Sequence, residues 1–163
     1  MESLSRTERS EWTIVDDLYD PLRRFAAVVA PSDLDPDDLL QESLVSVLRK
    51  HRLSELEHPA AYLRRTVLNT AISHNRRMGR RRHAVARYRA GEDATRSPVY
   101  PSDLSELDRL PPRERGALYL HEIEGYRYVE IAEMLECSES AARKAGTRGK
   151  RRLHDLYFEE VAG

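Results

Sequence analysis

Apolar residues recur at steps of three and four positions along almost the whole chain, and this spacing constrains the fold more than any other feature of the sequence. Such steps place the apolar side chains on one face of a helix, which turns by about 100° per residue. Runs of alternating apolar and polar residues, which mark strands, are absent, as are Asn-Gly and Asp-Gly hairpin turns between such runs. The sequence therefore predicts an all-α protein.

The apolar spacing predicts three helices in the first half of the chain. The first covers residues 12–30, and Pro21 is expected to bend or split it, because proline lacks the backbone N–H that a helix uses. The second covers residues 36–51, and Asp35 can cap its first turn. The third covers residues 59–79. These three helices form the first of two predicted small domains.

Residues 90–107 differ from both flanks, because they contain glycine, prolines, carboxylates and scattered polar residues without periodicity. This composition predicts a flexible acidic linker between a domain over residues 1–89 and a domain over residues 108–163. In the second domain the sequence predicts three helices, with a tight turn at residues 136–137. Ser138 is expected to cap the last of these helices. This layout is typical of a helix-turn-helix unit.

The charges are separated along the chain, although its 27 basic and 28 acidic residues nearly cancel. Residues 58–91 contain nine arginines and no carboxylate, and residues 143–163 have a net charge of +3. The stretches between and before them, residues 1–57 and 92–142, have net charges of −6 and −7. A basic block without compensating carboxylates, such as residues 58–91, favours an anionic partner such as DNA. A solvated arginine-rich face without a partner is the alternative interpretation.

Several classes of protein are disfavoured by the sequence. A membrane span needs about 18 apolar residues in a row, and the chain has no such run and no recognisable secretory signal. The single Cys137 cannot form an internal disulfide, and the spacing of His58, His74 and His83 does not place two metal ligands on one helix face. We therefore expect a cytoplasmic protein that is not an enzyme and has no catalytic residue, metal or cofactor.

The last helix combines an apolar stripe with basic residues on its other faces. In a helix-turn-helix unit the first turns of the second helix contact base edges, and later basic residues contact phosphates. The candidates for base contacts are Arg143, Lys144 and Arg148, and those for phosphate contacts are Lys150, Arg151 and Arg152. A three-helix packing unit that binds no DNA is the alternative for this segment.

Three segments, in this order, resemble the extracytoplasmic-function group (group IV) of bacterial RNA polymerase sigma factors, within the sigma-70 family. The polymerase-binding helix of that family is similar to DPDDLLQESLVSVLRK at 35–50. Its promoter-melting helix is similar to HPAAYLRRTVLNTAISHNRR at 58–77. Its upstream-element domain is similar to LPPRERGALYLHEIEGYRYVEIAEMLECSESAARKAGTRGKRRL at 110–153. The resemblance implies sigma region 2 in the first domain and sigma region 4 in the second.

The resemblance also implies a function and three sets of contact residues. The function is to bind core RNA polymerase and direct it to specific promoters, with an anti-sigma factor as an expected further partner. The polymerase set is Asp38, Gln41 and Glu42. The downstream-element set is Tyr62, Arg64, Arg65, Asn69, Arg76, Arg77, Arg80 and Arg81, with Asn69 beside a pocket for a flipped base. The upstream-element set is Ser140, Arg143, Lys144, Thr147, Arg148, Lys150 and Arg151.

Alternatives remain open at this point. Core packing is the favoured alternative role for Tyr62. A stand-alone helix-turn-helix regulator would explain the second domain, although it would not need the acidic helix at 35–50. An enzyme acting on nucleic acid would need a metal-type cluster near the basic helix, and none is visible in the sequence.

The last helix, whose first turns are expected to contact base edges, departs from the family pattern at two interior glycines, Gly146 and Gly149. Each glycine costs about 0.8–1 kcal/mol relative to alanine in a helix. We therefore expect this helix to be marginally stable until it meets DNA or another protein.

Overall fold

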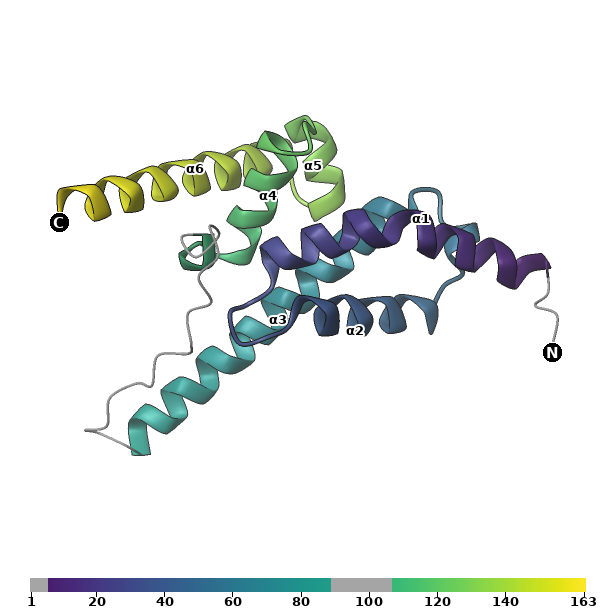
Figure 1. The fold of residues 1–163 in the computed structure, drawn as a ribbon, viewed down its shortest axis with the longest axis horizontal. Coiled ribbons are helices and arrows are strands. Elements are labelled where there is room, and N and C mark those ends of the chain that lie inside the picture. The colour runs from purple at the N-terminus through teal and green to yellow at the C-terminus, as the bar shows by residue number, and fades with distance from the viewer. Residues whose placement is uncertain (1–5, 89–106) are drawn as a thin grey trace.

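The computed structural model describes residues 6–88 and 107–163, and every regular element within these ranges is helical (Figure 1). The all-α prediction is confirmed for this part of the chain. The α-helices are α1 (Arg6–Val29), α2 (Pro36–Leu48), α3 (Pro59–Tyr88), α4 (Pro112–Glu122), α5 (Tyr128–Leu135) and α6 (Glu139–Ala162). Short 3₁₀ turns cover Leu53–Glu55 and Leu107–Arg109. Most of the predicted linker, residues 89–106, lies outside the described residues.

The first three helices pack around one apolar core, in which Phe25, Leu39, Leu63 and Val67 are fully buried. Local signals fix where α2 begins. The Asp35 side chain accepts a hydrogen bond from the backbone N–H of Asp37 at 2.8 Å, and a proline occupies the first helical position. The predicted cap is confirmed, and α2 is therefore positioned with its apolar stripe inward and its polar face outward.

Several of the predicted helix limits differ from the structure, since α1 already begins at Arg6 and α2 ends at Leu48. α1 continues through Pro21, because the following turn packs Leu22 and Phe25 into the core and so offsets the missing hydrogen bond. α3 does not end near Gly79 but extends nine residues further, to Tyr88. Its C-terminal half projects away from the other helices (Figure 1). A glycine in an exposed helix is tolerated at a small cost, and it ends a helix only where the backbone must turn.

The second half of the described chain is a helix-turn-helix unit, as predicted. α5 ends at Glu136, which adopts a left-handed conformation with φ of 49°, and the N–H of Cys137 donates to the carbonyl of Ala132 at 3.0 Å. The Ser138 hydroxyl accepts from the N–H of Ala141 at 3.1 Å and caps α6. The turn therefore sets the direction in which α6 leaves α5.

The two glycines of α6, Gly146 and Gly149, lie on the face of the helix that packs against α4 and α5. A Cβ at Gly146 would lie 2.7 Å from the hydroxyl of Tyr128, and a Cβ at Gly149 would lie 3.1 Å from the carbonyl oxygen of Glu114. The glycines therefore let α6 approach α5 and α4 closely. This packing offsets their helix-propensity cost, which the sequence alone presented as a cause of marginal stability.

The two halves of the molecule contact each other directly. α4 packs against α1 and α3, and α5 packs against α3. The buried apolar residues of both halves form one continuous cluster, which runs from Leu22 in α1 to Ala145 in α6. The sequence did not predict this contact, and the domain limits at residues 89 and 108 remain predictions.

Candidate nucleic-acid interface

The face of α3 that points to solvent contains most of the predicted downstream-element residues. At about 100° per residue, Tyr62, Arg65, Asn69, Arg76 and Arg80 share one side of the helix. Arg77 lies at the edge of this side, about 60° from Tyr62, whereas Arg81 lies about 100° from Tyr62 and points away from it. Asn69 and the four later arginines are exposed. The structure thus brings six of the eight predicted residues onto one surface.

Arg64 also lies outside this surface, because helix geometry places it on the far side of α3. Only 6% of its side chain is exposed, and its guanidinium donates to the Glu124 carboxylate at 3.0 Å. It also lies over the ring of Tyr126, 5.6 Å from the ring centre. In this arrangement Arg64 faces the second half of the chain rather than solvent.

Tyr62 is half-buried and packs against the core, as the favoured alternative proposed. Its hydroxyl lies 3.0 Å from Nε2 of His51, and the two rings meet edge to face. The guanidinium of Arg65 lies over its ring, 4.7 Å from the centre. Tyr62 is therefore a fixed aromatic residue at the edge of the α3 surface, with its ring orientation set by both neighbours.

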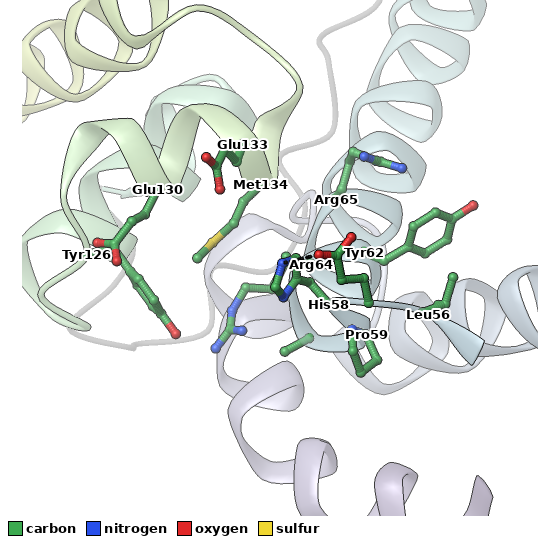
Figure 2. A pocket seen from close by; sticks show the side chains of 13 residues that line it. Leu56, His58, Pro59, Tyr62, Arg64, Arg65, Tyr126, Glu130, Glu133 and Met134 are labelled. Carbon is green, nitrogen blue, oxygen red and sulfur yellow. Dashed lines mark ion pairs between the residues drawn. The ribbon is translucent and has the colours of Figure 1, made fainter. Parts of the chain in front are cut away.

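A cavity of about 550 Å³ lies between the start of α3 and α5 and is lined by residues of both (Figure 2). Tyr62 and Arg65 approach it from α3, and Tyr126, Glu133 and Met134 lie on the opposite side. One wall is therefore basic and aromatic, whereas the other contains carboxylates. An anion would be attracted to the first wall and repelled by the second.

Arg65 also contacts a carboxylate of the second half. Its guanidinium lies 3.0 Å from Glu136, the residue that ends α5. Sequence reasoning did not identify Glu124 or Glu136 as partners of the basic helix, since each lies at least 60 positions from the arginine with which it pairs. Glu136 was noted only as a turn residue.

The predicted polymerase-binding residues form one exposed face of α2. Asp38, Gln41 and Glu42 line a shallow depression together with Val45, which is 47% exposed. Sequence reasoning missed Val45, although its spacing places it on the same helix face as Asp38, Gln41 and Glu42 and could have found it. Asp37 points elsewhere and accepts a hydrogen bond from Nε of Arg23 at 2.7 Å, and this bond lowers the pKa of its carboxyl.

The predicted upstream-element residues all lie exposed on α6. Arg143 pairs with Glu139 at 3.0 Å and lies over the ring of Tyr128, and Lys150 pairs with Glu122 at 3.2 Å. Within the described ranges, no ion pair is formed by the other three basic residues of the set, Lys144, Arg148 and Arg151. α6 therefore presents a basic face whose central cations, Lys144, Arg148 and Arg151, have no ion-pair partner in the part of the chain that the structure describes.

The described residues also bear on two other kinds of site, a membrane span and a metal centre. None of the helices in these ranges is both long enough and apolar enough to cross a membrane. The same ranges contain no group of three or more histidine, cysteine or carboxylate side chains arranged to bind a metal ion.

Comparison with known proteins identifies both halves. Residues 14–93 match the model of sigma-70 region 2, and residues 104–153 match that of sigma-70 region 4. The chain is 30% identical over 133 residues to the RNA polymerase sigma factor CarQ of Myxococcus xanthus, a match that covers 76% of this chain and 75% of the relative. The chain belongs to the extracytoplasmic-function sigma factors.

Two further comparisons agree with this family. This sigma factor is 31% identical over 147 residues to the ECF RNA polymerase sigma factor SigE of Mycolicibacterium smegmatis, covering 83% of this chain and 57% of that one. Its fold matches that of RpoE in a co-crystal with the anti-sigma factor NepR from Bartonella quintana, with a TM-score of 0.63 and 18% identity. That match covers 89% of this chain and 94% of the other.

The family gives the described surfaces their context. As a sigma factor, the chain binds core RNA polymerase and directs it to promoter DNA, where transcription begins. Proteins of this family are DNA-binding regulators of transcription. The predictions of family and function are confirmed, whereas the roles of individual residues remain predictions.

Proposed function

We propose that this sigma factor divides the work of initiation among three surfaces, on α2, α3 and α6. The observation that supports this division best is the location of the three residue sets. Each set lies mainly on one exposed face of a single helix, with a charge suited to its partner. The α2 face is acidic, whereas the α3 and α6 faces are basic.

The α2 surface is proposed to bind core polymerase. Exposed carboxylates at Asp38 and Glu42 can steer association with a basic partner surface, and Gln41 can add a neutral hydrogen bond. The exposed Val45 supplies apolar area between them, which suits a protein interface with an apolar centre and a polar rim.

The α3 surface is proposed to capture the opened downstream strand. Flipping a base out of the duplex costs a few kcal/mol, which stacking and hydrogen bonds must return. Tyr62 offers an aromatic ring and Asn69 an exposed amide on the same side of the helix. Arg76 and Arg80 follow along this side, with Arg77 at its edge, and can hold the phosphates of the strand. Arg81 is exposed on the adjoining flank of the helix, where it can add a further phosphate contact.

The α6 surface is proposed to read the upstream element in the major groove. The first turns of the helix expose Ser140, Arg143 and Lys144, and the next turn exposes Thr147 and Arg148. Arginine and lysine can pair with guanine edges, and serine or threonine can contact several bases. Lys150 and Arg151 follow at positions suited to phosphate contacts.

The remaining features of the proposed function follow from these surfaces. The chain is proposed to act through binding energy alone, which is divided between two promoter elements, and to perform no covalent chemistry. It is proposed to act in the cytoplasm with the polymerase. Domains over residues 1–89 and 108–163 would each read one element, joined by residues 90–107. An anti-sigma factor is a proposed partner, supported by the likeness to the RpoE fold in its complex with NepR.

The experiment combines the purified chain with core polymerase and a promoter library and sequences the transcripts. We expect initiation from a restricted set of promoters. Asn69→Ala should reduce open-complex formation about tenfold or more, because the strand loses its amide contact, while affinity for core polymerase stays unchanged.

Asn75→Ala is the matched control, since Asn75 is exposed but lies about 120° from Asn69 around α3, outside the proposed strand surface. Equal defects in the two variants would remove Asn69 from the strand site. Binding of promoter DNA by the chain alone, with no association with core polymerase, would instead indicate a stand-alone regulator.

A further inference from the structure

The ring of Tyr62 is held from outside α3 as well as by the helix itself. Its hydroxyl lies 3.0 Å from Nε2 of His51, and the two rings meet edge to face with their centres 5.2 Å apart. His51 is exposed and lies between α2 and α3, so it reaches Tyr62 from a separate segment of the chain. A hydrogen bond and a ring contact to the same neighbour restrict the rotation of the tyrosine ring.

The segment that contains His51 is itself fixed on both sides. The backbone N–H of His51 donates to the carbonyl of Val47 at 2.8 Å, which continues the last turn of α2. Two residues after His51, Leu53 is fully buried in the core. The carboxylate of Glu11 accepts hydrogen bonds from the backbone N–H groups of Leu53 and Ser54. The His51 ring therefore has a fixed support, which a residue needs if it is to orient another side chain.

The contact between His51 and Tyr62 contributes little to the stability of the fold. His51 is exposed and Tyr62 is half-buried. A hydrogen bond between side chains that water can reach largely replaces hydrogen bonds to water. The ring of Tyr62 packs against the core whether or not its hydroxyl has a partner. A contact that adds little to folding but fixes the direction of an aromatic ring is best explained by what that ring binds.

The direction of the Tyr62 ring matters for the proposed capture of the opened strand. Tyr62 and Asn69 lie on the same side of α3, about 10 Å apart along the helix axis. A base stacks only on a ring whose face is presented to it. A site whose side chains are already oriented loses less conformational entropy when it binds. His51 supplies this orientation from the connecting segment, and Arg65 contacts the ring from within α3.

We propose that His51 is a positioning residue for promoter opening, which orients the Tyr62 ring through its hydroxyl so that the ring stacks on a base of the opened strand. His51 acts through Tyr62 and does not contact the strand itself. The inference rests on the proposed role of Tyr62 in strand capture. It deepens that role, because it assigns a function to a residue outside the downstream-element set.

The test compares single and double variants of the full chain bound to core polymerase. His51→Ala removes the partner of the hydroxyl, Tyr62→Phe removes the hydroxyl but keeps the ring, and a double variant combines both. His51→Gln is the conservative variant, because its side-chain amide can form a hydrogen bond with the hydroxyl. The DNA is a promoter from which the chain initiates, with 2-aminopurine in place of one downstream-element base at a time. The rate of open-complex formation and the 2-aminopurine fluorescence, which reports base stacking, are measured.

The rate of open-complex formation should fall about fivefold in His51→Ala and in Tyr62→Phe, and no further in the double variant, because both substitutions break the same contact. The fluorescence at the captured position should change alike in the two single variants. His51→Gln should retain most of the wild-type rate. Losses that multiply in the double variant would overturn the proposal, since His51 would then act on the strand directly. A loss in His51→Gln as large as that in His51→Ala would overturn it as well.

His58→Ala is the matched control, since His58 lies in the same connecting segment, its side chain is 75% exposed and its ion pair is with Glu57. Unchanged affinity for core polymerase shows that the variants are folded. If Tyr62→Ala impairs opening while His51→Ala behaves like His58→Ala, the positioning role is overturned and the proposed function stands. If Tyr62→Ala has no effect, the proposed role of Tyr62 is overturned, and the positioning role with it.

Discussion

At the scale of single residues, Glu11 shows how one carboxylate connects distant segments. It accepts hydrogen bonds from the backbone N–H of Leu53 at 2.7 Å and of Ser54 at 3.0 Å, and also from the Ser54 hydroxyl. Burial alone would raise the pKa of Glu11, but the hydrogen bonds from Ser54 and Leu53 outweigh it and lower this pKa. The carboxylate thus ties α1 to the turn that leads into α3.

A pH dependence follows from the lowered pKa of Glu11. Its contribution to stability is present above the ordinary glutamate pKa of about 4.3 and is lost as the pH falls through the lower folded-state value. Glu11→Gln should reduce the free energy of unfolding at pH 7 by about 1 kcal/mol and flatten its decline between about pH 5 and 3. Urea unfolding across this range measures both effects.

Glu57→Gln is the control, because the Glu57 side chain is 91% exposed. If the stability of both variants follows the same pH curve as the wild type, the Glu11 contacts do not contribute.

The glycines give a second prediction at this scale, with opposite signs at two positions. Gly146→Ala should destabilise the protein by about 1–3 kcal/mol, because the new methyl group would meet Tyr128 at 2.7 Å. Gly79→Ala should stabilise it by about 0.5–1 kcal/mol, because a Cβ at this position would have no neighbouring atom within 4 Å and only helix propensity changes. Thermal unfolding of the two variants measures the difference, and a shift of the same sign in both would contradict the packing role of Gly146.

At the scale of elements, most helices could be predicted because their signals are local. The caps at Asp35 and Ser138 and the turn at Glu136 all act within a few residues of the chain. Pro21 and Gly79 misled the prediction, since tertiary packing and tolerance of exposed glycine decide those positions. The close approach at Gly146 could not be predicted, because it depends on where Tyr128 lies in space.

The basic face of α6 gives a prediction at the same scale. Arg148→Ala should weaken binding to the upstream element by about 1–3 kcal/mol if the side chain contacts a base, and the loss should depend on sequence. A phosphate contact would instead weaken all duplexes alike and lower the salt slope by about one. Titration of cognate and scrambled duplexes at several salt concentrations distinguishes the two.

Arg113→Ala serves as the comparison, since Arg113 is exposed on α4 outside the predicted surface. Unchanged affinity in Arg148→Ala, or an equal loss in both variants, would remove Arg148 from the contact surface.

At the scale of the whole molecule, the family and its three surfaces could be recognised from sequence, whereas the contact between the halves could not. The residue types that suit DNA contacts can be recognised in the sequence, whatever the helices pack against. The pairing of Arg64 with Glu124 joins positions 60 residues apart, and neither side chain carries a local sign of its partner. The near-zero net charge thus has a structural counterpart, because some of the opposite charges neutralise each other across the contact.

The length of α3 has a consequence for how the molecule meets DNA. Its 30 residues span about 45 Å, and its C-terminal half projects away from the other helices (Figure 1). The exposed arginines from Arg76 to Arg82 lie on the projecting part, beyond the ion pairs at Arg64 and Arg65 (Figure 1). The projecting part of α3 is therefore a cationic arm that stays accessible while the two halves are in contact, and its charge suits the phosphates of any duplex irrespective of base sequence.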